Sequence, residues 1–176
     1  MWVWLTIGGF AVVLLVLGLF YLGQQGVTQV NIEGLVVLPD PGTGHQEGTI
    51  VYERDVPVGG PHNPDWQNCG IYDQPIRIEN VVHSLEHGAV WLAYQPDLPA
   101  SQVETLRDLV RGESLVVLAP KPGLKSPIIA TAWRVQLEVN SASDERLPLF
   151  LGHYQRGPYT PEPGAPCTGG VGDPLS

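Results

Sequence analysis

The sequence predicts an α+β protein, in which an N-terminal transmembrane helix is followed by one small exported domain with a mixed sheet and two or three helices. Three observations lead to this prediction. Residues 2–22 form an apolar run without a charged side chain. The remainder of the chain has a length that suits one domain with a modest core. From residue 89 on, its segments follow the order strand, helix, strand, strand, helix, which is typical of an α+β domain.

Residues 1–22 are expected to be an uncleaved, single-pass membrane anchor. A helix rising ~1.5 Å per residue would make the apolar run roughly 30 Å long, which matches the hydrocarbon core of a bilayer. A buried globular helix or a cleaved signal peptide is the alternative, but no A-x-A cleavage pattern follows the run. No lysine or arginine precedes Arg54, so the flank lacks the basic residues of a cytoplasmic side. We therefore expect the C-terminal domain to lie outside the cytoplasm. Aromatic residues near both ends resemble interfacial belts: Trp2, Trp4, Phe20 and Tyr21.

The net charge of the chain limits the classes of molecule that it is expected to bind. Its 18 acidic and 9 basic side chains give a net charge of −9. Such acidity argues against nucleic-acid binding, which needs a basic surface, and against adhesion to anionic lipid. The expected contact with membrane lipid is therefore through the N-terminal helix.

Three segments are expected after the anchor. Residues 23–48 form a connector rich in Gly, Pro and Gln, whose apolar run at 34–39 could be a short strand or a stalk contact. Residues 49–157 form the α+β extracytoplasmic domain, and residues 158–176 form a Pro/Gly-rich tail. Within the domain, residues 54–75 form a long irregular segment, and loops of this length are often functional.

The helices are predicted from apolar spacing and end signals. Asn80 is expected to cap a short helix over residues 81–87 that Gly88 ends. Residues 100–111 repeat apolar side chains at helical spacing before Gly112, and a last helix is expected over residues 144–155.

The strands are predicted from β-branched and aromatic content, at residues 49–52, 75–79, 89–94, 115–118 and 128–139. The segments 89–94 and 115–118 are joined through a helix, so we expect them to pair in parallel, with 128–139 returning antiparallel. The last of these is predicted as one long strand, with one face made of Ile129, Thr131, Trp133, Val135, Leu137 and Val139.

Cys69 and Cys167 are the only cysteines, and in an oxidising compartment two cysteines suggest one disulfide. The tail has few apolar side chains to bury, so it is expected to be disordered unless it is tethered. A Cys69–Cys167 bond would tether it and, by closing a loop of about a hundred residues, stabilise the fold by up to ~4.7 kcal/mol. The alternative is that Cys69 is a thiolate metal ligand beside His62.

The segment Val82–Gly88 concentrates the chemically active side chains. On a helix, His83, Glu86 and His87 share one face because residues three and four apart are neighbours. His45 and His62 lie upstream, so four of the five histidines fall between residues 45 and 87. Three or four imidazoles with a carboxylate suit a zinc or copper(II) ion. Because Met1 is the only methionine, a methionine-rich copper(I) site is excluded.

Two other interpretations of these residues stay open. The pattern H-x-x-E-H is formally that of inverted zincins, but the further ligand of those proteases on a distant helix has no clear equivalent here. The histidines could instead form a structural hydrogen-bond network with Asp65, Tyr52 or Trp66. No serine or cysteine nucleophile, G-x-G-x-x-G motif or P-loop is found, so an enzyme is less expected than a binding protein.

Two long motifs carry a resemblance. They are Pro61-His62-Asn63-Pro64-Asp65-Trp66-Gln67-Asn68-Cys69-Gly70-Ile71-Tyr72 and Val82-His83-Ser84-Leu85-Glu86-His87-Gly88. With them the chain resembles a bacterial family, domain-of-unknown-function family 3105, over roughly residues 40–172. The resemblance implies a single membrane anchor with an exported domain and says little about mechanism. Family N-termini often carry a basic leader that is not found here, and the sequence leaves open whether one is missing.

These observations predict a membrane-anchored extracytoplasmic domain that binds zinc or copper through His45, His62, His83, His87 and Glu86. The alternative is a non-enzymatic accessory subunit of a cell-envelope, respiratory or photosynthetic membrane complex, in which the histidines are structural. The single anchor and the small acidic domain motivate that alternative.

Overall fold

A computed structural model describes residues 31–175 of the chain. The predicted anchor at residues 1–22 and the first part of the predicted connector lie outside the described residues. Among residues 31–175, no helix is both long enough and apolar enough to cross a membrane. The residues from Ile32 onward form one compact unit.

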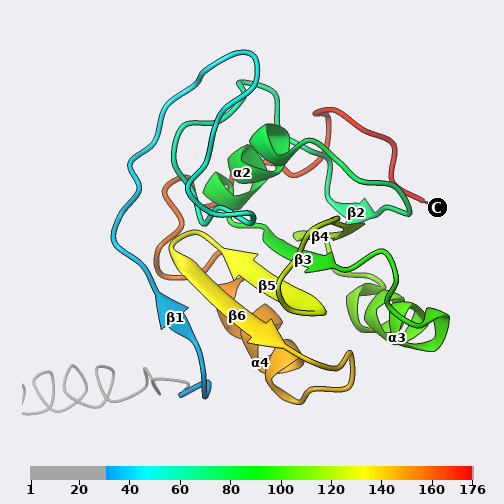
Figure 1. Cartoon of the computed structure of the whole chain (residues 1–176). Helices are drawn as coiled ribbons and strands as arrows, with labels where there is room; N and C mark the ends of the chain where they lie inside the picture. Colours follow the sequence, from blue (N-terminus) through cyan, green and yellow to red (C-terminus); the bar gives the residue numbers. More distant parts are fainter. Residues whose placement is uncertain (1–30, 176) are drawn as a thin grey trace, which may run out of the picture. The chain divides into compact units, whose positions relative to one another are not determined.

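A six-stranded mixed sheet runs through the middle of this unit, in the order β1-β6-β5-β3-β4-β2 (Figure 1). The strands β2 and β3 both pair in parallel with β4, whereas the pairs β3–β5, β5–β6 and β1–β6 are antiparallel. The predicted parallel pair and the predicted mixed sheet are therefore confirmed. The strands are β1 (Val36–Val37), β2 (Gly70–Ile71), β3 (Val90–Tyr94), β4 (Val116–Pro120), β5 (Ile128–Ala132) and β6 (Val135–Val139).

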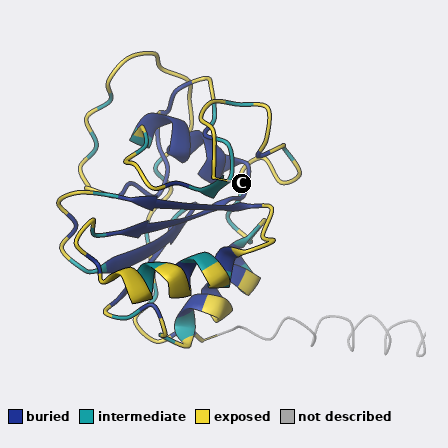
Figure 2. Cartoon of the chain, turned by 90° about the vertical axis from the view of Figure 1, so that its right-hand side faces the viewer, coloured by how far each residue is buried: buried dark blue, intermediate teal, exposed yellow. Residues whose placement is uncertain are grey.

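The two faces of the sheet carry different layers. Helices α3 (Ala100–Val110) and α4 (Arg146–Tyr154) pack on one face, and α2 (Ile78–Glu86) packs on the other (Figures 1 and 2). The outer faces of α3 and α4 are largely exposed, while α2 is buried on nearly all sides because loops and the tail cover it (Figure 2). A helix in the middle of such a stack can hold polar side chains away from water.

Each face has its own apolar core. Leu106 of α3 and Phe150 of α4 pack against the first face. On the second face, Val81 and Leu85 of α2 pack against Trp91 of β3. Residues three and four apart share a helix face. Because the apolar face of α2 packs on the sheet, the polar residues of the helix face the loop that covers it.

The segment predicted as one strand at 128–139 is a hairpin, so that prediction is wrong. The chain reverses at Trp133 and Arg134, and Arg134 has a φ of 66°. The Arg134 N–H donates to Val58 O at 2.7 Å, and its Nε donates to Leu38 O at 3.1 Å, which holds the unusual conformation. Because the turn reverses the chain, Ile129 faces α2, whereas the β6 residues Val135, Leu137 and Val139 face α3 and α4.

Two predicted strands are absent from the described sheet. Residues 49–52 form an irregular segment in which Val51 is 95% exposed, since no strand pairs with it. Residues 75–77 are irregular too, and α2 already begins at Ile78. Asn80 therefore lies inside the helix rather than capping it, and its side-chain amide donates to Asp65 O at 2.6 Å. The predicted helices at 100–111 and 144–155 are confirmed to within two residues.

The predicted disulfide is confirmed. Cys69 and Cys167 are bonded, with their Cα atoms 5.3 Å apart, so Cys69 is not a thiolate ligand. The Cys69 N–H also donates to Cys167 O at 2.7 Å, and Gln67 bridges to Val171 further along the tail. The tail thus lies against the loop that covers α2 (Figure 1).

Gly88, just after α2, is expected to be sensitive to substitution. Its φ is +95°, and a Cβ atom would meet Arg156 Cα at 3.0 Å. Gly88→Ala should lower the free energy of unfolding by more than the ~1–2 kcal/mol that a positive φ alone costs, as measured by urea denaturation. Gly112→Ala is the matched control, because Gly112 has a φ of +85° but no atom within 4 Å of the added carbon. Equal losses in the two variants would show that the contact with Arg156 contributes nothing.

Candidate metal centre

The second half of α2 presents two of the predicted ligands. His83 and Glu86 lie three residues apart on the helix, on the side that faces the irregular loop, and both are buried. The apolar neighbours Val82 and Leu85 face the sheet. The amphipathic pattern of the helix therefore positions the two polar side chains without any ion.

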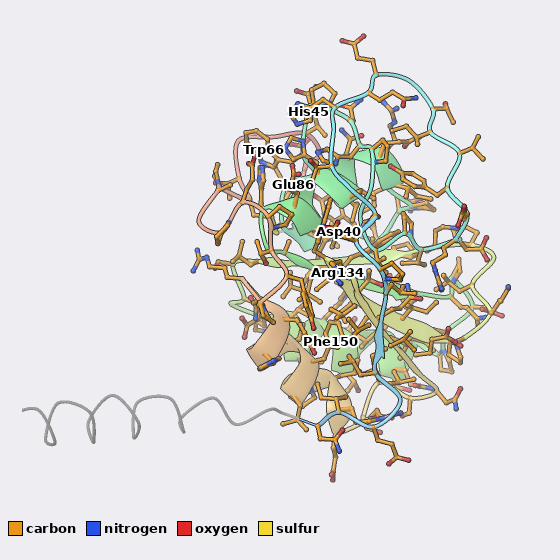
Figure 3. All side chains as sticks on the ribbon, turned by 90° about the vertical axis from the view of Figure 1, so that its left-hand side faces the viewer. Asp40, His45, Trp66, Glu86, Arg134 and Phe150 are labelled. Carbon is orange, nitrogen blue, oxygen red and sulfur yellow. A yellow bond between two sulfur atoms is a disulfide. The ribbon has the colours of Figure 1, made fainter. Side chains whose placement is uncertain are left out.

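The other two ligands come from the loops above α2. His62 is fully buried, and His45 is exposed on the strap, which we define as residues 44–52. The backbones of His45 and His62 form a parallel bridge: the His62 N–H donates to Gly44 O at 2.9 Å, and the Gln46 N–H donates to His62 O at 2.7 Å. Figure 3 shows His45 and Glu86 on the same side of the domain.

These four side chains converge on one point. One potential ligand atom from each of His45, His62, His83 and Glu86 can be chosen so that all lie within 4.8 Å of one another. The ring centroids of His62 and His83 are 4.7 Å apart, and that of His45 is 5.1 and 5.0 Å from them. A tetrahedral zinc site with bonds of ~2.0–2.1 Å places its ligand atoms about 3.3 Å apart, so at least one side chain must move inward to close the site.

The backbone fixes which ring nitrogens are available. His62 Nδ1 lies 2.9 Å from Gly60 O, and His83 Nδ1 lies 2.8 Å from Asn63 O. A carbonyl oxygen only accepts, so both Nδ1 atoms carry hydrogen and each neutral ring has its lone pair on Nε2. Metal-binding histidines are oriented by such a hydrogen bond from the other ring nitrogen.

The contact between His62 and Glu86 is the most informative one. His62 Nε2 lies 3.0 Å from Glu86 Oε2, yet within the described residues this nitrogen has no hydrogen-bond partner of acceptable geometry. In a neutral ring its lone pair would face a buried carboxylate, and two acceptors this close repel each other. A cation between them removes the repulsion. The cluster of His45, His62, His83 and Glu86 could therefore hold a metal ion.

The pKa of His83 supports the same conclusion. The pKa of His83 is lowered from 6.5 to about 4, mainly by burial and also by the neighbouring imidazoles, against the opposing effect of the hydrogen bond to Asn63. His83 is therefore neutral near pH 7, which is the form that binds a metal.

His87 lies beside this group rather than in it. It follows the last residue of α2, and its Nδ1 donates to Pro166 O at 2.7 Å. Its Nε2 lies 3.8 Å from a carboxylate oxygen of Glu162, and its ring packs against His83 and Trp66. The structure thus brings together four of the five predicted ligands and holds His87 against the tail.

Tyr52 and Asp65, which the structural interpretation paired with the histidines, make other hydrogen bonds among the described residues. Tyr52 donates to Pro61 O at 2.8 Å, and Asp65 O accepts from Asn80. These contacts fix the loop to the strap and to α2 without a metal ion. The backbone carbonyls that accept hydrogen bonds from the histidine rings belong to Gly60, Asn63 and Pro166. They were not predicted, because the direction of a backbone carbonyl cannot be inferred from the identity of its residue.

The fold and the site define a small α+β domain that carries a candidate histidine–glutamate metal centre against a disulfide-tethered tail. The chain belongs to the family described as "Protein of unknown function (DUF3105)", which matches residues 45–169. That range contains all four converging side chains and both cysteines. Comparison with curated proteins and with solved structures gave no match.

The metal-free protein is expected to lose stability in acid because of His83. Its folded-state pKa of about 4 lies below the ordinary 6.5, so the unfolded chain binds the proton more tightly. Stability should be full above about pH 6.5 and fall as the pH drops to about 4, by up to about 3 kcal/mol. Urea denaturation at a series of pH values in the presence of a chelator measures this loss. The loss should be much smaller in His83→Gln and unchanged in His153→Ala; equal losses in both would contradict the assignment to His83.

Proposed function

We propose that this protein is a membrane-anchored, extracytoplasmic domain that binds one divalent transition metal ion. His62, His83 and Glu86 supply the buried ligands, and His45 supplies the fourth. The observation that carries the proposal is the His62 Nε2 atom, which is buried, lacks a hydrogen-bond partner within the described residues and lies 3.0 Å from the Glu86 carboxylate.

The donor set indicates zinc or copper(II). Three imidazoles and one carboxylate are borderline and hard ligands, and both cysteines are in a disulfide. A site without thiolate or thioether suits these ions better than copper(I), and nitrogen ligands suit them better than magnesium or calcium. The disulfide supports an oxidising compartment. The uncharged run at residues 2–22 supports the anchor.

Metal titration of the full chain tests the proposal. The protein is purified in detergent without a histidine tag, stripped with a chelator, and titrated with zinc or copper(II) in competition with a chelating dye. We expect one ion per chain, no saturable binding of magnesium, and a loss of affinity of at least about 100-fold in His62→Ala and His83→Ala.

His153→Ala is the matched control. His153 is the fifth histidine of the chain, half-buried on α4, on the opposite face of the sheet. Its removal should leave binding unchanged. The proposal is overturned if the wild type binds no ion, or if His62→Ala binds as tightly as His153→Ala.

The accessory-subunit alternative stays a prediction of the sequence. The described residues hold no observation that favours it over metal binding. Co-purification from detergent-solubilised membranes is the measurement that would favour it.

A further inference from the structure

One ligand of the proposed centre differs from the other three in its exposure. His62 is 0% exposed, and His83 and Glu86 are each 4% exposed, whereas His45 is an exposed residue. The buried ligands are held in place: two by hydrogen bonds to backbone carbonyls, and Glu86 by its position in α2. An ion would therefore rest on a fixed three-ligand cradle with one ligand on the solvent side.

Aromatic rings flank two of the buried ligands. Trp66 packs against His83 at 5.7 Å between ring centroids, and Trp133 packs against His62 at 6.3 Å. Below the cradle, α2 rests on the apolar face of the sheet. Of the four candidate ligands, His45 is the exposed one.

The backbone around His45 is held to the buried ligand His62, because the His62 N–H donates to Gly44 O and the Gln46 N–H donates to His62 O. Gly44 and Gly48 bracket His45 with φ values of +143° and +87°, and a Cβ at either position would have no atom within 4 Å. The strap is also attached at the N-terminal end of α2, because Arg77, just before the helix, donates to Gly48 O at 2.8 Å and Glu79 accepts from the Ile50 N–H at 3.1 Å. Residues 44–48 are thus tied down at both ends, and the exposed imidazole of His45 is the part of this segment that an incoming donor would displace.

We propose that the ion is a transferable cargo and that it leaves by ligand substitution at His45, an inference that rests on the proposed function. An incoming nitrogen or oxygen donor forms a coordinate bond to the ion as the bond to the His45 imidazole breaks. The His45 lone pair returns to the ring, the oxidation state of the ion does not change, and the three buried ligands hold the ion until the incoming donor has bound.

Stopped-flow transfer to a chromophoric chelator tests this inference. The full chain in detergent is loaded with one equivalent of zinc and mixed with increasing excesses of 4-(2-pyridylazo)resorcinol. We expect a transfer rate that rises in proportion to chelator concentration. His45→Ala opens a coordination position, so its second-order rate constant should be about tenfold higher or more, while His153→Ala should behave as the wild type.

The outcomes separate the two proposals. If the wild type cannot be loaded with zinc or with copper(II), the proposed function fails and the inference with it. If it loads but the rate does not depend on chelator concentration, or if His45→Ala transfers at the wild-type rate, the metal site stands and substitution at His45 is wrong. Because His45 is exposed, its removal is not expected to unfold the domain, and circular dichroism of the loaded variant checks this.

Discussion

Replacing Cys69 and Cys167 by serine is expected to lower the free energy of unfolding by about 2–5 kcal/mol. The bond closes a loop across a sequence separation of 98 residues, so its loss gives the unfolded chain much more freedom. Such a loss is a large part of the total stability of a domain of this size. Urea denaturation of the full chain in detergent measures it.

Loss of the disulfide should affect the tail before it affects the rest of the domain. Beside the disulfide it is held by hydrogen bonds from Asn68 to Val171 O and Gly172 O and from Leu175 to Ile71 O. In the double serine variant the tail is expected to open locally and be cut by a protease under conditions in which the sheet remains intact. Wild-type protein treated with a reductant should match the variant. A loss below about 1 kcal/mol would mean that the hydrogen bonds alone hold the tail.

The sequence predicted best where local patterns agree with long-range contacts. The parallel pair of β3 and β4 follows from two buried strands joined by a helix that begins after Pro99 and ends before Gly112. The disulfide of the tail could also be predicted. A segment with so few apolar side chains is expected to be disordered unless a covalent bond tethers it, and Cys167 can form that bond with Cys69.

The errors lie where tertiary contacts override local signals. The turn at Trp133 and Arg134 lacks the glycine or asparagine that marks tight hairpins, and contacts with Leu38 and Val58 hold it instead. His87 satisfies the helical spacing of the predicted ligands, but α2 ends at Glu86 and the ring is held by Pro166. His87 and Pro166 are 79 residues apart in the sequence. Helical periodicity relates residues only a few positions apart, so it could not predict this contact.

Glu86→Gln is expected to change metal binding and stability in opposite directions. The Glu86 carboxylate lies 3.0 Å from His62 Nε2, which has no hydrogen-bond partner of acceptable geometry among the described residues. The amide of glutamine can donate to that nitrogen, so the variant should be more stable by about 1–2 kcal/mol in the presence of a chelator at pH 7.5. The same change removes the only anionic ligand of the group and should weaken zinc binding at least about 100-fold.

The sign of the stability change decides between the two interpretations of the site. If His62 and Glu86 were a structural ion pair, the ring would be protonated, and the glutamine Oε1 would accept its hydrogen bond without the negative charge that strengthens it. The variant would then be destabilised by about 1–3 kcal/mol. A protonated Glu86 that donates to His62 would give a change close to zero, because glutamine reproduces that donor.

Glu162→Gln provides the control for the general effect of removing a carboxylate near a histidine. Its carboxylate lies 3.8 Å from His87 Nε2 and is 60% exposed, so water screens the interaction. Its unfolding free energy should change by less than about 0.5 kcal/mol and its zinc affinity should stay the same. Metal ligands direct their lone pairs toward one point, so they repel one another when no ion is bound. The stability gained by Glu86→Gln would be a direct measure of that repulsion.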